Sequence, residues 1–436
     1  MDFRSAVVVM LCIAVLGFSC TSYFREAESE GISDDDAGDD CIETLIPSPC
    51  QDGYDPELEK LARMYDRQFH VFNAFGHGIN SDIIVSLDEP ENRALIEDFL
   101  REYDGWDFEA WSGKHQFDVV ASWEPVAGLY AGVGVAADAF RYGVLRDQGY
   151  DEDEVELARR HLLDAIEAWH IAVAITGTPG VIARGYLRKD IPSAAENIET
   201  TPLFDEYGNP LPPEKNNGTW RDDNSGGMYP NYIWIDSCSR DQFIGWVAGL
   251  AAAWEVIRDD PSFPDSLKRQ MQEDASALGR SLMVVRKSGF DLEIFDADGR
   301  TTYHGYLNEN SFDRIYLPFL PFKNGMHSLM ALGIVAALAY VAEDPVLDWY
   351  LHEELIGKRQ LHRIIRSNLV GVDFGVKTNY SNVNMAVMGA WLALRYIRDE
   401  DVRRDLRIAL KKNLYDKPLR TRQPVEQAQS LYDFVY

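Results

Sequence analysis

Four segments of this chain are apolar on nearly every side and rich in Gly and Ala. A helix that is apolar all round must be covered all round, so these segments predict helices buried inside the protein. Each has 13 to 15 residues, fewer than the roughly 20 that a membrane-spanning helix needs. They cover residues 126–139, 245–257, 328–342 and 384–396.

Each apolar segment is followed by a segment whose charged residues recur at helical spacing. Such an amphipathic helix needs cover on one side only. The alternation therefore predicts an inner layer of buried helices surrounded by an outer layer, in an all-α fold. The amphipathic partners cover residues 153–170, 264–283, 345–365 and 400–415.

The connections between these predicted helices differ in length. A short turn joins each inner helix to the next outer helix. The connections from an outer helix back to the next inner helix are longer, and we call them return segments. They are residues 176–237, residues 286–323 and the shorter segment 367–382. Long ordered loops in a compact domain are usually functional. All three returns end where inner helices begin, and helix N-termini present free N–H groups there. We therefore expect the functional site at that end of the helices.

The first 20 residues are typical of an export signal, with Arg4 before the apolar run 6–18. The run 16–20, LGFSC, resembles a bacterial lipoprotein cleavage site, in which Cys20 becomes the lipidated first residue. Gly17 stands where such sites usually carry Leu, so ordinary signal-peptidase cleavage is the alternative. Residues 21–51 are acidic and poor in apolar side chains, which predicts a disordered tether. The expected location is the cell envelope, at the outer membrane or its periplasmic face, or else outside the cell.

The cysteine content and the net charge limit which disulfides, metal sites and macromolecular partners the chain can have. Cys41 and Cys50 are close enough to form a disulfide in an oxidising envelope, and the sequence leaves this open. Cys238 has no second cysteine nearby, so we expect no metal site and no cofactor. The formal net charge of −29 argues against nucleic acid as a partner.

The helix alternation and the uneven connections resemble the (α/α) toroids of the six-hairpin glycosidase type. The resemblance covers roughly residues 54–436, and it implies one (α/α) barrel or toroid domain over residues 52–436. A small β-hairpin insertion in this domain is predicted separately, from residues 290–307. Enzymes of this fold class commonly act on carbohydrates at the face where the inner helices begin. The final segment 431–436, LYDFVY, is typical of the start of another inner helix. The domain is then either truncated or closed in a different way.

Three carboxylates near the expected face are candidates for catalysis, because glycoside hydrolysis uses a pair of carboxyl groups. Asp236 and Asp241 lie before and within the start of the second inner helix, and Glu124 precedes the first. Each also has a structural interpretation. Ser239 and Gln242 form a capping-box pattern, and Asp241 and Glu124 suit the positive end of a helix dipole.

Other side chains on this face have the chemistry to contact a sugar. Tyr232 and Trp234 offer aromatic faces to sugar rings, and Arg184 and Arg240 offer charged hydrogen-bond donors. The alternative for Arg184 is a structural contact with a carbonyl group or with a carboxylate such as Asp222.

The segment 290–307 predicts a β-hairpin with a turn at Asp298-Gly299. Its second strand carries His304 and Tyr306. Together with His327, these residues could supply the acid and base of a lyase.

These observations lead to three hypotheses. The first is an envelope-anchored enzyme that hydrolyses a glycosidic bond with Asp241 and Glu124 as the carboxyl pair. Asp236 is the alternative member of that pair. The second is a non-catalytic surface lipoprotein that binds a glycan, a peptide or a partner protein. The third is a polysaccharide lyase that uses Tyr and His. The expected partners are a carbohydrate or another small polar ligand, and a membrane reached through the lipid anchor.

Overall fold

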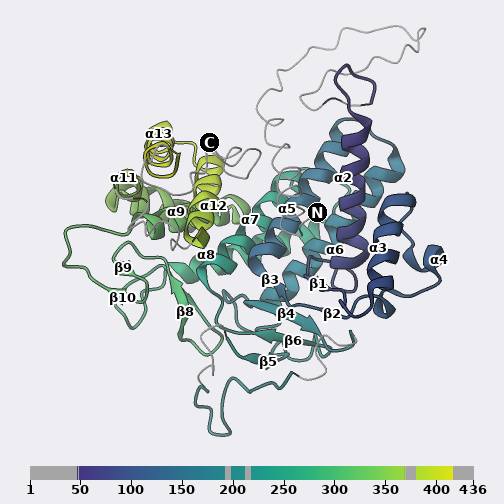
Figure 1. The fold of residues 1–436 in the computed structure, drawn as a ribbon. Helices are drawn as coiled ribbons and strands as arrows, with labels where there is room; N and C mark the ends of the chain where they lie inside the picture. The colour runs from purple at the N-terminus through teal and green to yellow at the C-terminus, as the bar shows by residue number, and fades with distance from the viewer. Residues whose placement is uncertain are drawn as a thin grey trace.

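The computed structural model describes residues 47, 49–191, 198–211, 218–367, 369 and 380–415. This part of the chain is mostly helical, with small sheets (Figure 1). Cys20 and most of the predicted tether lie outside it. Cys50 is disulfide-bonded, and its predicted partner Cys41 also lies outside the described residues.

The four Gly- and Ala-rich segments form buried helices, as predicted. They contact one another in chain order, α5 with α7, α7 with α9 and α9 with α12. Helix α9 is long and apolar enough to cross a membrane, and 83% of this stretch is buried inside the protein. The four helices are α5 (Gly128–Asp147), α7 (Arg240–Ile257), α9 (Gly325–Ala342) and α12 (Tyr380–Tyr396).

Glycines set the spacing between the buried helices. A Cβ atom on Gly132 of α5 would lie 1.7 Å from the carbonyl oxygen of Gly245 in α7, and one on Gly333 of α9 would lie 2.4 Å from that of Gly389 in α12. Real Cβ atoms do not approach that closely, so only glycine permits these helix pairs. The composition that predicted burial is thus also what lets the backbones touch.

The amphipathic segments pack around the buried helices with one face exposed. Helix α6 contacts α5, α8 contacts α9, and α13 contacts α12. The third partner is interrupted rather than continuous, since its middle is π-helical. These elements are α6 (Glu152–Ala174), α8 (Asp265–Leu282), α10 (Pro345–Trp349), η4 (Tyr350–Lys358), α11 (Leu361–Ser367), α13 (Glu400–Leu410) and η6 (Lys411–Tyr415).

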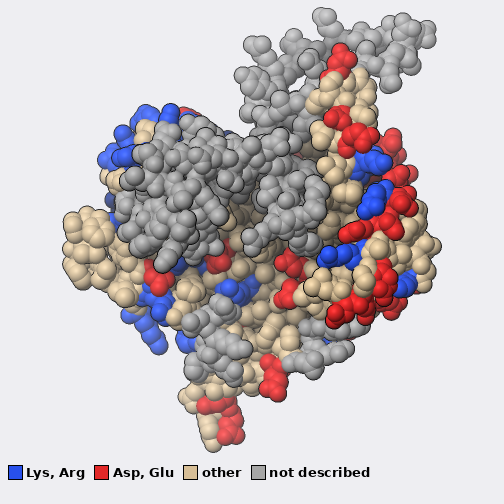
Figure 2. Space-filling view, viewed as in Figure 1, with Lys and Arg blue, Asp and Glu red and all other residues tan. Residues whose placement is uncertain are grey.

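The chain before α5 forms a subsidiary layer with its own apolar cluster around Phe72, Phe99 and Phe108. Its elements are α2 (Pro56–Gln68), η2 (Phe69–Asn73), β1 (Ile83–Ile84), α3 (Pro90–Glu102), α4 (Phe108–Ser112), η3 (Gln116–Asp118) and β2 (Ser122–Trp123). Acidic side chains crowd this side, at the right of Figure 2, while basic ones gather over α11 and α13. The acidic charge is therefore unevenly distributed.

The long return segments form small sheets at one end of the buried helices, the lower end in Figure 1. The first return supplies most of a four-stranded antiparallel sheet in the order β3-β4-β6-β5, and the second supplies the hairpins β7-β8 and β9-β10. The turn of the β7-β8 hairpin contains Asp298 and Gly299, as predicted. The strands are β3 (Val126–Ala127), β4 (Gly185–Arg188), β5 (Trp220–Asp222), β6 (Tyr232–Ile235), β7 (Glu293–Phe295), β8 (Thr301–Tyr306), β9 (Ser311–Phe312) and β10 (Ile315–Tyr316).

Candidate functional site

The two long returns meet at the segment that leads from β6 into α7. The Ser237 N–H donates to Asp296 Oδ2 at 2.6 Å, and the Thr302 hydroxyl donates to the Cys238 carbonyl at 2.7 Å. Ser237 has a φ of 60°, in the left-handed region. Contacts from the second return thus hold the entrance to α7 in place.

The predicted catalytic role of Asp236 does not fit its surroundings. Its side chain is fully buried, and it accepts hydrogen bonds from the Arg221 guanidinium at 2.6 and 2.8 Å and from the Thr219 N–H at 2.7 Å. A carboxylate with these partners and no exposed surface has no oxygen left for a substrate. Asp236 is a structural residue that ties β6 to β5.

Trp234 is also unavailable to a ligand. Its side chain is fully buried, and the indole N–H donates to the Asp222 carbonyl at 2.9 Å. The aromatic face predicted to stack on a sugar instead packs in the apolar core.

The predicted capping box at the start of α7 does not form. Ser239 is the N-cap residue, but its hydroxyl makes no capping hydrogen bond and instead contacts the Arg184 guanidinium at 2.6 Å. Gln242 Oε1 accepts from the Leu129 N–H in the first turn of α5 at 2.8 Å. Arg184 therefore has a structural partner, and Gln242 joins two helix starts.

Four ionisable side chains lie close together at the start of α7, and we call them the α7 site: Arg240, Asp241, His304 and Asp313. Asp313 Oδ1 lies 3.9 Å from Arg240 Nη2 and 3.7 Å from His304 Nδ1. Asp241 lies in the first turn of α7 and is partly buried. The structure thus brings together three of the predicted residues and adds Asp313, which the sequence pattern did not indicate.

Charge and burial shift the pKa values at the α7 site. Burial lowers the pKa of Arg240, and the carboxylates of Asp313 and Asp241 oppose that shift. Arg240 Nε and Nη1 are buried and make no hydrogen bond of good geometry within the described structure. Burial and the neighbouring Arg240 charge lower the pKa of His304, which favours its neutral form. The site therefore combines free donors, a neutral imidazole and two carboxylates.

His327 lies behind the α7 site rather than at its surface. It is buried, and its Nδ1 lies 2.8 Å from the Ser311 hydroxyl. Burial and the charge of Arg240 lower its pKa to about 3, so it is neutral. Its predicted direct contact with substrate does not fit this burial.

Glu124 and Tyr232 occupy other positions. Glu124 is exposed between β2 and β3 rather than in a helix, because residues 122–127 are extended and α5 begins only at Gly128. Tyr232 lines a cavity of about 450 Å³ between the loop 74–78 and α6.

The cavity beside α6 contains several polar groups. His77 is buried between Gly76 and Gly78, and neither of its ring nitrogens makes a hydrogen bond of good geometry. Burial and the charge of Arg188 lower the pKa of His77 to about 4. Asp164 of α6 also lines this cavity, and burial raises its pKa. A ligand of monosaccharide size fits the volume.

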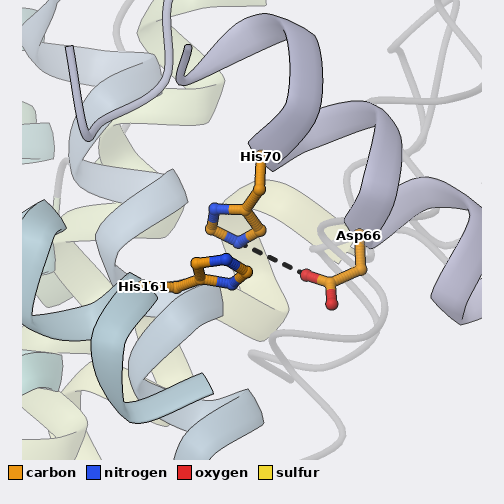
Figure 3. Close-up of side chains that lie close together, drawn as sticks. All are labelled: Asp66, His70 and His161. Atoms are coloured by element: carbon orange, nitrogen blue, oxygen red, sulfur yellow. Dashed lines mark ion pairs between the residues drawn. The ribbon is translucent and has the colours of Figure 1, made fainter. Parts of the chain in front are cut away.

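Two histidines that line this cavity, His70 and His161, belong to a further cluster (Figure 3). His70 Nε2 lies 3.3 Å from Asp66 Oδ1 and 3.1 Å from Asp138 Oδ1. The rings of His70 and His161 are stacked, with centroids 3.5 Å apart. Asp66 also pairs with Arg141 at 2.7 Å.

The carboxylates determine the charge of these two histidines. Burial disfavours the charged form of His70, but Asp138 and Asp66 outweigh it and raise its pKa to about 9. Burial and the charge of His70 lower the pKa of His161 to about 2. Asp66 and His70 are four residues apart, which places them on one helical face. This spacing is visible in the sequence, but the two residues were not among the predicted site residues.

No protein-family description, curated protein or solved structure matches this chain.

Proposed function

We propose that this protein is an envelope-anchored, carbohydrate-active enzyme with a toroid-type helical core and a reaction centre at the α7 site. The toroid proposal is supported by the alternation of buried and partly exposed helices. The anchor proposal rests on Cys20 and the acidic tether. Mass spectrometry of the mature N-terminus tests the anchor, because an unmodified Cys20 would exclude lipidation.

One observation supports the choice of this site. The Asp313 carboxylate lies close to both Arg240 and His304, and Asp241 lies beside them at the start of the buried helix α7. Asp241 comes from the first turn of α7 and Asp313 from the second return segment, so the two carboxylates can flank a ligand between them. Glycoside hydrolysis needs one carboxyl group as acid and a second as base or nucleophile. Asp241 and Asp313 are our pair, and Asp313 takes the place that was predicted for Glu124.

The surrounding groups suit a sugar ligand. The unpartnered guanidinium nitrogens of Arg240 can donate to hydroxyl oxygens, and neutral His304 can donate or accept. Tyr303 presents its ring beside them, with the Arg314 guanidinium 3.8 Å from the ring centroid. These groups would orient the ligand while the carboxylates act.

The test is release of reducing ends from a glycan panel by the mature protein. Asp241→Asn should reduce the rate by a factor of about 10² to 10⁴, as expected for loss of a catalytic acid or base. Asp259→Asn is the matched control, because Asp259 is an exposed carboxylate just beyond the other end of α7. Equal activity of both variants would contradict the proposed role of Asp241.

The burial of Asp236 favours a second candidate, a binding protein without turnover, because it removes one of the predicted carboxylates. In that case no glycan of the panel is cleaved, but one binds in calorimetry, and Arg240→Ala weakens the binding. Cleavage by the wild type excludes this alternative.

A further inference from the structure

The side chains of Asp66, His70 and His161 form a compact donor set that the proposed function does not use, and Asp138 lies beside His70; we call these four residues the His70 cluster. They come from α2, η2, α5 and α6, so four helical segments build it. Nitrogen and carboxylate oxygen donors of this kind are typical ligands of zinc and related divalent ions.

The spacing of the donor atoms fits a shared cation. Ligand atoms of Asp66, His70 and His161 all lie within 4.8 Å of one another. Two ligands with bonds of about 2.0–2.1 Å in a tetrahedral site are separated by about 3.3 Å. His70 Nε2 lies 3.3 Å from Asp66 Oδ1 and 3.1 Å from Asp138 Oδ1, which matches that separation.

Buried atoms of the cluster lack hydrogen-bond partners. Asp138 is only 5% exposed, and its Oδ2 makes no hydrogen bond within the described structure; the same holds for the buried Nδ1 of His161. Most buried polar atoms in proteins are satisfied, so unsatisfied ones call for an explanation. A cation bound among these atoms would satisfy them.

We propose that the His70 cluster binds one divalent transition-metal ion, with zinc as the simplest choice. On binding, the cation takes the place of the proton on His70 Nε2, between the two carboxylates, and that proton is released to solvent. The stacked rings cannot both direct an in-plane lone pair at one point, so one ring turns on binding. His161 is the ring that can turn, because its Nδ1 makes no hydrogen bond. Arg141 remains on Asp66 and orients that carboxylate.

The cavity beside α6 gives the ion a route to the cluster. Both His70 and His161 line it, together with Asp164 and Glu167. Its volume of about 450 Å³ also leaves room for water or a small ligand at an open coordination position.

The test is calorimetric titration of the mature, chelator-treated protein with zinc chloride. We expect one ion per chain with micromolar or tighter affinity, and at least 100-fold weaker binding for His161→Gln and for Asp66→Asn. His352→Gln is the matched control, because His352 is half-exposed and pairs with one aspartate, Asp348, four residues earlier. It should bind as the wild type does. Absence of saturable binding, or unchanged binding in both cluster variants, overturns the proposal.

A second measurement does not depend on the folding of variants. Anomalous diffraction at the zinc edge, from wild-type crystals grown with zinc, should give a peak between Asp66, His70 and His161. A peak only at other residues, or no peak, overturns the proposal.

Discussion

Gln242 in the first turn of α7 accepts a hydrogen bond from the backbone N–H of Leu129 in the first turn of α5, at 2.8 Å. The first N–H groups of a helix have no partner within that helix. A side chain from one buried helix therefore caps its neighbour, and the two helices begin in a fixed register beside the α7 site.

Replacing Gln242 with Met should leave the Leu129 N–H unsatisfied in a largely buried position. We expect the free energy of unfolding to fall by about 1–3 kcal/mol, measured by urea denaturation. Gln242→Glu retains an acceptor oxygen and should lose less. Equal stability of the Met variant and the wild type would show that this contact contributes nothing.

Gly132 should tolerate no larger residue. An added Cβ would lie 1.7 Å from the Gly245 carbonyl oxygen, so Gly132→Ala must push α5 and α7 apart. We expect a loss of about 3 kcal/mol or more. Gly143 lies on the same helix, and its Cβ would meet only the two Val256 methyl groups, at 3.4 and 3.6 Å. Gly143→Ala should therefore be neutral or stabilising by up to about 1 kcal/mol, and a similar loss in both variants would refute the close-packing argument.

The buried helices could be predicted from sequence because their composition leaves them no exposed face. The hairpin turn at Asp298-Gly299 was equally local, since its residue types specify it. The four-stranded sheet was not predictable. Its strands have two to four residues, too few for an alternating pattern, and β3 pairs with β4 across more than fifty residues of chain.

The candidate site was harder to predict because tertiary contacts override local patterns. Ser239 and Gln242 match a capping box, yet both side chains bond to distant residues. Asp236 and Asp241 are alike in sequence, and it is the contacts with the Arg221 guanidinium and the Thr219 N–H that make Asp236 structural. Asp313 has no local signature, and its place beside Arg240 depends on how the second return folds.

The Arg221–Asp236 pair should be sensitive to loss of one partner. Arg221→Met leaves a buried carboxylate without its counter-charge, which costs about 3–5 kcal/mol of stability. Adding Asp236→Asn to that variant removes the unpaired charge, so the double variant should be more stable than the single one. The measurement is urea denaturation of the three proteins. A double variant no more stable than Arg221→Met would show that the charge is not the cause.

The pKa of His77, lowered to about 4, predicts a loss of stability in acid. The unfolded chain takes up a proton near pH 6.5, and the folded chain takes up the same proton only near pH 4. Stability therefore falls as the pH drops through this window. Between pH 7.5 and 5, the wild type should lose about 2 kcal/mol more than His77→Gln. Parallel pH profiles of the two proteins would contradict the assignment of a neutral, buried His77.

Hydrogen–deuterium exchange with the glycan that binds best in the panel tests the location of the α7 site most directly. We predict slower exchange in residues 237–245 and 301–316, which carry Arg240, Asp241, His304 and Asp313. Protection confined to residues 69–78 and 161–171, around the cavity beside α6, would contradict this account.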